Sequence, residues 1–171
     1  MAFDAFLKLM NAANQVVAGE SQDATHRNEI ELSGYNLGAV HPVTQSSATG
    51  GAGAGKATFN DFSFTIAASR VSPILFQACA QGTRFNQAIV TLRKSAGGSK
   101  TGTGLEFLKI TMGSVLVSHF STGGSSGDDV PHDDVHLSYG KIQIQYTPQR
   151  TDGSADVPVS GGWDVQKNGP A

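Results

Sequence analysis

The segment Asp61-Phe62-Ser63-Phe64-Thr65-Ile66-Ala67 decides the fold class of this chain. Its apolar and polar side chains alternate, and this period of two is typical of a strand with one face in a core and the other in water. Similar short segments recur along the sequence, at residues 3–9, 30–32, 35–39, 88–93, 105–112, 115–120, 135–139 and 142–146. A series of half-polar strands of this kind predicts an antiparallel sandwich or barrel.

Two glycines mark changes in the phase of this alternation. The apolar positions shift across Gly34 and again across Gly140. We interpret the shift at Gly34 as a glycine-marked β-bulge.

One segment, residues 72–82, has the pattern of a helix. Ser72 is a good N-cap, Pro73 suits the first helical position, and Gly82 suits a left-handed C-terminal stop. The predicted apolar face of this helix is formed by Ile74, Leu75, Phe76, Ala78 and Cys79.

Length and composition bound the class of protein. The 171 residues suit a single domain over 1–171, and 12 basic against 14 acidic residues give a net charge of −2. This balance argues against nucleic acid as the main partner. One cysteine, Cys79, excludes an intrachain disulfide and a multi-cysteine zinc site. The start MAFDAFLKLM lacks the features of a secretory signal, and no apolar run approaches the roughly 20 residues of a membrane span.

A glycine-rich loop resembles a phosphate-binding motif in part. Gly50 and Gly55-Lys56 match its spacing, but Ala57 replaces the hydroxyl residue that would bind magnesium. The motif also needs a following helix, whereas residues 59–66 predict a strand. We therefore predict a flexible loop and no nucleotide cofactor.

Histidines and carboxylates suggest two further chemistries. The stretch of Asp128, Asp129, His132, Asp133, Asp134 and His136 could hold a divalent ion, with His132, Asp133 and His136 as its candidate ligands, but a solvated acidic turn explains the stretch better. His26 or His119 could join a serine triad, but no Gly-x-Ser-x-Gly elbow places a nucleophile. We predict no catalytic residues, no metal and no cofactor.

Ungapped blocks along the whole chain resemble the Hcp family of type VI secretion proteins. These blocks are MAFDAFLKL, GES at 19–21, THRNEIEL at 25–32, the turn at 35–38, GKATFNDFSFT at 55–65, SPILFQACAQG at 72–82, AIVTLRK at 88–94, EFLKITMGSVLVSHFSTGGSSGDD at 106–129, VHLSYGKIQIQYTPQ at 135–149 and GWDVQKN at 162–168. The departures lie in loops, where residues 11–18 are longer than the usual first turn and Ser95 is an extra residue.

The resemblance implies a compact two-sheet antiparallel β-barrel with one short helix on its side. It implies a non-enzymatic tube subunit, in which six copies form a ring and rings stack inside a contractile sheath. The implied partners are other copies of the chain, the tip spike protein VgrG, sheath and baseplate proteins, and small effectors carried in the ring lumen. Assembly would take place in the bacterial cytoplasm, followed by export without a cleaved signal peptide.

The resemblance also assigns candidate contact residues. Tyr35, Asn36 and Leu37 correspond to a strand that lines the lumen, and the small polar Asn36 is expected to face it. The candidates for contacts between rings or subunits are Gly51, Gly53, Gly55, Lys56, Gly97, Gly98 and Gln166. The alternative function is a ligand-binding or metal-dependent enzymatic barrel that uses His132, Asp133 and His136.

Overall fold

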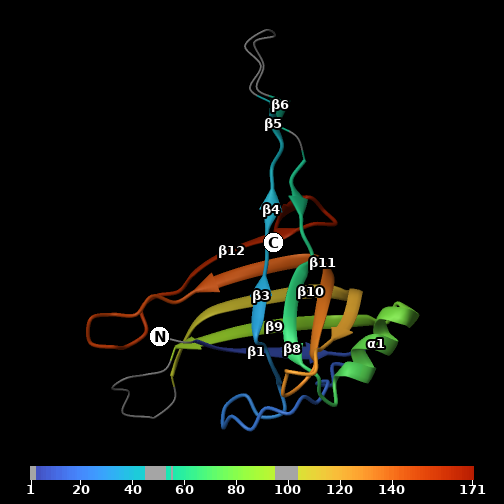
Figure 1. The fold of residues 1–171 in the computed structure, drawn as a ribbon. Helices are drawn as coiled ribbons and strands as arrows, with labels where there is room; N and C mark the ends of the chain where they lie inside the picture. The colour runs from blue at the N-terminus through green and yellow to red at the C-terminus, as the bar shows by residue number, and fades with distance from the viewer. Residues whose placement is uncertain (1–2, 45–52, 55, 95–103) are drawn as a thin grey trace.

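A computed structural model describes residues 3–44, 53–54, 56–94 and 104–171 (Figure 1). The elements in chain order are β1 Phe3–Met10, β2 Ile30–Glu31, β3 Gly34–Asn36, β4 Ala39–Val40, β5 Val43–Thr44, β6 Gly53–Ala54, β7 Thr58–Phe59, β8 Phe62–Ala67, α1 Ser72–Gln81, β9 Arg84–Lys94, β10 Leu105–Gly123, β11 His132–Tyr146, β12 Val159–Asp164 and β13 Gly169–Pro170. The mainly β class with one short helix is confirmed.

Nine strands form one antiparallel sheet. Its order is β13-β12-β11-β10-β9-β1-β2, and β8 joins it by pairing with both β11 and β3. The long strand β11 uses its two halves differently, because residues 132–137 pair with β8 and residues 141–146 pair with β12. The strand β10 pairs with β11 along nearly its whole length.

The predicted two-sheet barrel is not closed among the described residues. The two ends approach each other through the segment between β2 and β3, which changes partner. Leu32 donates its backbone N–H to Ala5 of β1 over 2.9 Å, and Ser33 donates to Thr65 of β8 over 2.8 Å. The phase shift at Gly34 is therefore a change of partner strand, and the predicted bulge there is wrong.

The long strands also correct the predicted boundaries. Residues 105–112 and 115–120 belong to one strand, β10, and residues 135–139 and 142–146 belong to β11. The apolar pattern breaks at Ser114, which has a positive φ of 53°, and at Gly140, but pairing resumes on both sides. In both strands a local irregularity interrupts the apolar pattern, and for this reason the sequence predicted two strands where there is one.

The core lies on one face of this sheet. Phe62, Phe64 and Ile66 are fully buried, as the opening alternation predicted, and Val135 and Leu137 of β11 are buried beside them. The next strand in the sheet adds Val115 and Val117, and the opposite wall comes from β1 and β9.

The helix α1 caps one end of the core and ends at Gly82, whose left-handed φ of 64° confirms the predicted stop. Its N-cap is Val71 without a side-chain cap, so the predicted cap at Ser72 is wrong. The Ser72 hydroxyl instead donates a hydrogen bond to Asp133 of β11 and accepts one from the Ser69 N–H at 2.9 Å. This bond ties the first turn of the helix to the sheet.

The buried side chains of the helix also differ in part from the prediction. Leu75 and Ala78 are buried, whereas Ile74 is 43% and Phe76 is 61% exposed. The helix rests on the sheet through one narrow stripe, and these two apolar side chains remain on the surface. No helix among the described residues is long and apolar enough to cross a membrane.

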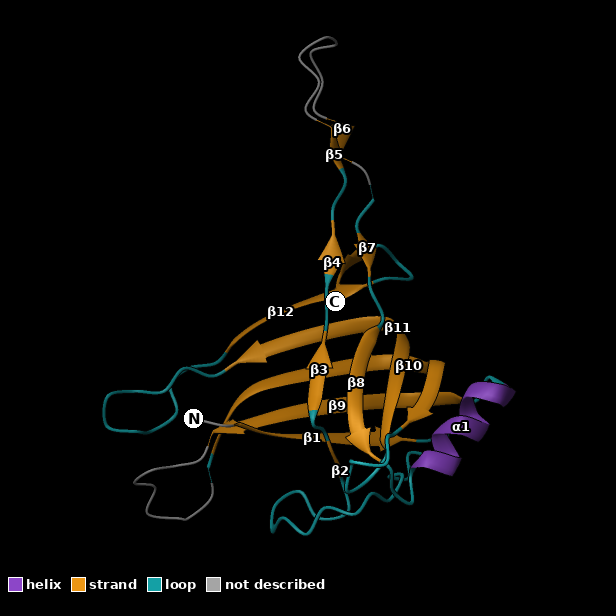
Figure 2. Cartoon of the chain, in the orientation of Figure 1, coloured by secondary structure: helices purple, strands orange, loops and turns teal. Residues whose placement is uncertain are grey.

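A hairpin arm projects from the body of the molecule (Figures 1 and 2). The segment that follows β3 and the segment that precedes β8 pair with each other in two small ladders, β4–β7 and β5–β6. At the base of the arm, Asn60 donates its N–H to Gly38 over 2.9 Å, and the Tyr139 hydroxyl donates to the Asn60 carbonyl over 2.9 Å. Tyr139 therefore holds the base of the arm against the sheet.

Replacing Tyr139 with Phe tests this anchor through its pH dependence. Burial, with a smaller contribution from the Asp61 charge, raises the pKa of Tyr139 to about 12. The neutral hydroxyl thus stabilises the fold below pH ~10, and this contribution is lost as the pH rises toward the raised pKa. Tyr139→Phe should cost about 1 kcal/mol at pH 7 and make unfolding free energy less sensitive to pH above 10. Denaturant titrations at several pH values measure this effect. If the unfolding free energy of Tyr139→Phe falls above pH ~10 as steeply as that of the unmodified chain, the role of Tyr139 is contradicted.

Candidate functional site

A row of polar side chains crosses four strands on the face opposite the core. Antiparallel pairing places Asn36 of β3 beside Ser63 of β8, Ser63 beside His136 of β11, and His136 beside His119 of β10. Directly paired residues point to the same side of a sheet. The row is therefore one continuous polar surface, which we call the polar face.

The three lumen candidates on β3 and just after it differ in exposure. Asn36 is exposed at the edge of the polar face. Tyr35 and Leu37 are half-buried and pack against the core, and the Tyr35 ring stacks on Phe62 at 5.9 Å between centroids. Burial raises the pKa of Tyr35 above its ordinary value. Asn36 is thus the member of this set that water or a cargo would meet.

The proposed grouping of His132, Asp133 and His136 is wrong. Successive residues of a strand point to opposite faces, so Asp133 lies on the core side of β11, away from both histidines. Asp133 is 1% exposed and accepts the hydrogen bond from Ser72. Its role is to anchor the helix.

The structure instead brings together His119, Asp134 and His136. One donor atom from each lies within 4.8 Å of the others, and His136 Nε2 is 3.5 Å from Asp134 Oδ2. The two imidazole rings are 4.7 Å apart between centroids. The acidic stretch considered from the sequence contains Asp134 and His136 but not His119, because His119 lies on another strand and reaches the polar face only through an irregularity in β10.

The structure describes three of the seven predicted contact residues, which are Gly53, Lys56 and Gln166. Gly51, Gly55, Gly97 and Gly98 fall outside the described residues. Gly53 begins β6 in the arm, and Lys56 is exposed between β6 and β7.

Gln166 follows β12 and is exposed. Its amide packs over Gly140, where an added Cβ would lie 2.9 Å from the Gln166 nitrogen.

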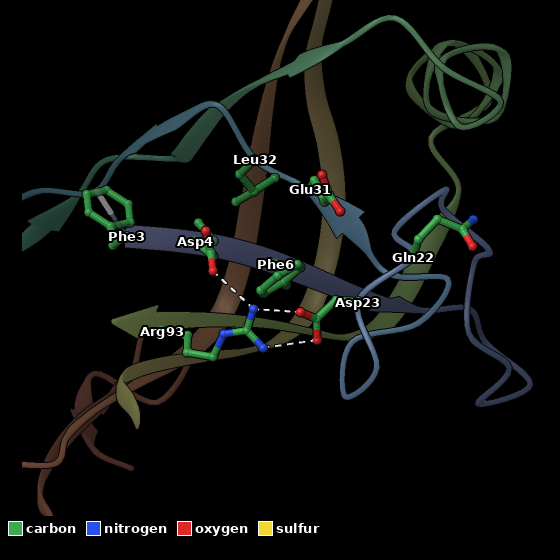
Figure 3. A pocket seen from close by; sticks show the side chains of 9 residues that line it. Phe3, Asp4, Phe6, Gln22, Asp23, Glu31, Leu32 and Arg93 are labelled. Carbon is green, nitrogen blue, oxygen red and sulfur yellow. Dashed lines mark hydrogen bonds and ion pairs between the residues drawn. The ribbon is translucent and has the colours of Figure 1, made fainter. Parts of the chain in front are cut away.

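A second polar cluster lines an open pocket at the edge of β1 (Figure 3). The Arg93 guanidinium binds Asp23 through contacts of 2.6 and 3.0 Å and reaches Asp4 at 3.0 Å. It also lies over the Phe6 ring, 5.2 Å from its centroid. These contacts tie the loop before β2 to β1 and β9.

His26, one of the histidines considered for a triad, belongs to the same structural cluster. Its Nδ1 lies 2.9 Å from Glu29, and its ring stacks on Phe6 at 4.3 Å between centroids. The imidazole thus packs into the loop and lies against a carboxylate and a ring, with a structural role.

The fold and the polar face together define a mainly β protein whose sheet has a core on one face and the polar face on the other. The family "Type VI secretion system effector, Hcp" matches residues 6–146. The "Protein hcp1" of Pseudomonas aeruginosa strain PAO1 is 39% identical over 169 residues, which is 98% of each chain. The chain belongs to the Hcp family of type VI secretion proteins.

Solved structures agree with this assignment. "A type six secretion system protein" superposes with a TM-score of 0.87 at 28% identity, over 99% of this chain and 100% of that one. Hcp1 from Salmonella typhimurium gives 0.77 at 29% identity and covers both chains fully. Membership of this family of secretion proteins confirms the prediction of a non-enzymatic protein.

Replacing Asp23 with Asn tests the ion-pair cluster. The Arg93 guanidinium, helped by hydrogen bonds from Thr25 and His26, holds the pKa of Asp23 well below its usual range. A lowered pKa means that the carboxylate stabilises the fold above pH ~4 and that this contribution is lost as the pH falls. Asp23→Asn should cost roughly 1–3 kcal/mol at pH 7 and make stability less sensitive to acid.

The control for this measurement is Asp129→Asn, which changes an exposed carboxylate. Its unfolding free energy should match that of the unmodified chain at pH 7. Equal losses in the two variants would show that the Arg93 cluster contributes no specific stability.

Proposed function

We propose that this chain is the subunit of a type VI secretion tube, in which six copies form a ring and rings stack. The polar face would line the channel, and small effectors would be carried there during export. The observation that supports this most is a family match along the chain together with a sheet whose second face is polar and uncovered. A sheet in a globular monomer more often leaves such a face to water alone, but the exposed apolar surfaces of this chain favour assembly.

Two apolar patches at different ends of the molecule support a ring. The first patch consists of Ile144, Tyr146 and Val159 and continues the core face of the sheet to a part that nothing in the described chain covers. Val159 is 68% exposed and pairs with Tyr146. The second patch is Phe76 on α1, which is 61% exposed and lies 5.9 Å between ring centroids from Phe120 of β10. The loop after β11 lies on the side of the body away from α1 (Figure 1). Different patches that meet head to tail generate closed rings or open filaments.

The hairpin arm supports contacts beyond one subunit. Its ladders are only two residues long on each strand and Val40 is 58% exposed, so the arm buries little apolar surface in its own chain. A projecting ribbon of this kind gains stability when another copy covers it. We therefore retain Gly51, Gly53, Gly55 and Lys56 as candidates for contacts between rings, together with Gly97, Gly98 and Gln166.

The remaining partners follow from the proposed tube. VgrG would sit at its tip, and sheath and baseplate proteins would surround and nucleate it. The subunit would assemble in the bacterial cytoplasm and leave through the apparatus without a cleaved signal peptide. A bacterial strain that lacks this chain should fail to export VgrG if the chain builds the tube. The strain should still export VgrG if the chain is only a cargo protein.

The proposed ring predicts the mass of the protein in solution and a substitution that should prevent assembly. Light scattering of the purified chain should give a mass near six times 17.8 kDa. Val159→Asp should give a folded monomer, because the side chain is exposed in one subunit but would be buried between two, where an unpaired charge is costly. Val159→Ile, which keeps the surface apolar, should retain the ring. A monomeric unmodified chain at micromolar concentration would contradict the proposal.

If the polar face binds cargo, substitutions on it should change cargo binding without affecting folding. Asn36→Glu should keep the ring, since the side chain stays solvated, and should change which effectors co-purify with it. Phe64→Glu should prevent folding, because it places a carboxylate among buried rings at a cost of several kcal/mol. Circular dichroism and co-purification measure the two effects. Unfolding of both variants would show that Asn36 is not on a free face.

A further inference from the structure

We propose that His119, Asp134 and His136 form a site for a divalent transition metal of the zinc type. Two imidazole nitrogens and one carboxylate oxygen converge on the solvent-facing side of β10 and β11, all within 4.8 Å of one another. This site differs from the grouping of His132, Asp133 and His136 considered from the sequence, because it takes its third ligand from the neighbouring strand. It does not depend on the proposed tube.

A β-bulge in β10 creates the site. Val115 and Val117 pair with Tyr139 and Leu137, and in this register residue 119 would face the core. The pairing shifts by one residue between Val117 and His119, so that His119 stands opposite His136 and the next residue returns to the core side. An extra residue of this kind re-aims the side chain that follows it.

The bulge is held in place by its own extra residue. The Ser118 hydroxyl lies 3.2 Å from the His136 carbonyl and also hydrogen-bonds the Asp61 carboxylate, just before β8. These contacts join β10 to β11 and β8 at the level of the two histidines. The ligands therefore stand on paired strands, and their spacing is set by the sheet and by the bulge in β10.

The donor set suits a borderline-soft ion. Imidazole nitrogens favour zinc, copper and nickel, and a carboxylate oxygen is a common third ligand at zinc. Tetrahedral bonds of about 2.1 Å require donor atoms about 3.4 Å apart. The His136–Asp134 pair is already at 3.5 Å, and rotation of the exposed His119 side chain supplies the remaining movement.

The position of the site gives it access to solvent and to a further ligand. His119 is exposed and the other two residues are partly exposed, so a bound ion would keep an open coordination position for water. The site shares its row with Ser63 and Asn36. In the proposed ring, which this one consequence requires, each subunit would present an ion to the channel.

Calorimetry of the full-length, untagged and chelator-treated chain with zinc chloride tests the site. We expect one ion per chain with micromolar affinity. His119→Ala and His136→Ala should each weaken binding at least about tenfold, and Asp134→Asn should weaken it less, because the amide keeps an oxygen donor. His41→Ala, which removes an exposed histidine from the start of the arm, should bind as the unmodified chain does.

Cobalt chloride supplies a second readout, because tetrahedral and octahedral cobalt differ in visible absorption. A tetrahedral spectrum that is lost in His119→Ala would support the site even where calorimetric heats are small. Circular dichroism and light scattering should show that the variants keep their fold and assembly, since the substituted side chains lie outside the core. Absence of zinc binding, or binding that His119→Ala and His136→Ala leave unchanged, would overturn the proposal. The ring mass is measured separately, so failure of the metal site and failure of the tube are distinguishable.

Discussion

The structure depends on one constraint: β11 must pair with two different strands along the same edge. Its first half pairs with β8 and its second half with β12, while β10 covers its other edge. Along the first half, each residue either enters the core beside Phe62 and Phe64 or joins the polar face. A shift of register by one residue would exchange these two faces, so the buried rings hold the polar surface in place.

Several features of the molecule follow from this strand. Asp133 points to the core side and binds Ser72, which positions α1, and Tyr139 reaches the base of the arm. Both are polar side chains on the buried face, and each makes a hydrogen bond there, Asp133 through one of its two carboxylate oxygens. The bulge at Ser118 then allows β10 to keep its core residues inside while His119 moves to the polar face.

The sequence predicts the class of fold and much of the core, because the alternation at Phe62, Phe64 and Ile66 is local and unbroken. It also predicts the end of the helix, since Gly82 adopts the left-handed conformation that it tolerates. It does not predict the change of partner at Leu32 and Ser33, because hydrogen bonding to a distant strand leaves no local pattern. The histidine cluster could not be predicted for the same reason, because His119 becomes a neighbour of Asp134 and His136 only through the register of β10 on β11.

We propose that Asn36 lies on a free face which several copies turn toward one channel. Electron paramagnetic resonance distances between spin labels at Asn36→Cys, in a chain that also carries Cys79→Ala, test it most directly. A ring predicts a small set of short distances in the pattern that sixfold symmetry requires, and these distances should disappear when Val159→Asp is added. A chain without dipolar coupling between labels, or with one distance typical of a dimer, would contradict the claim.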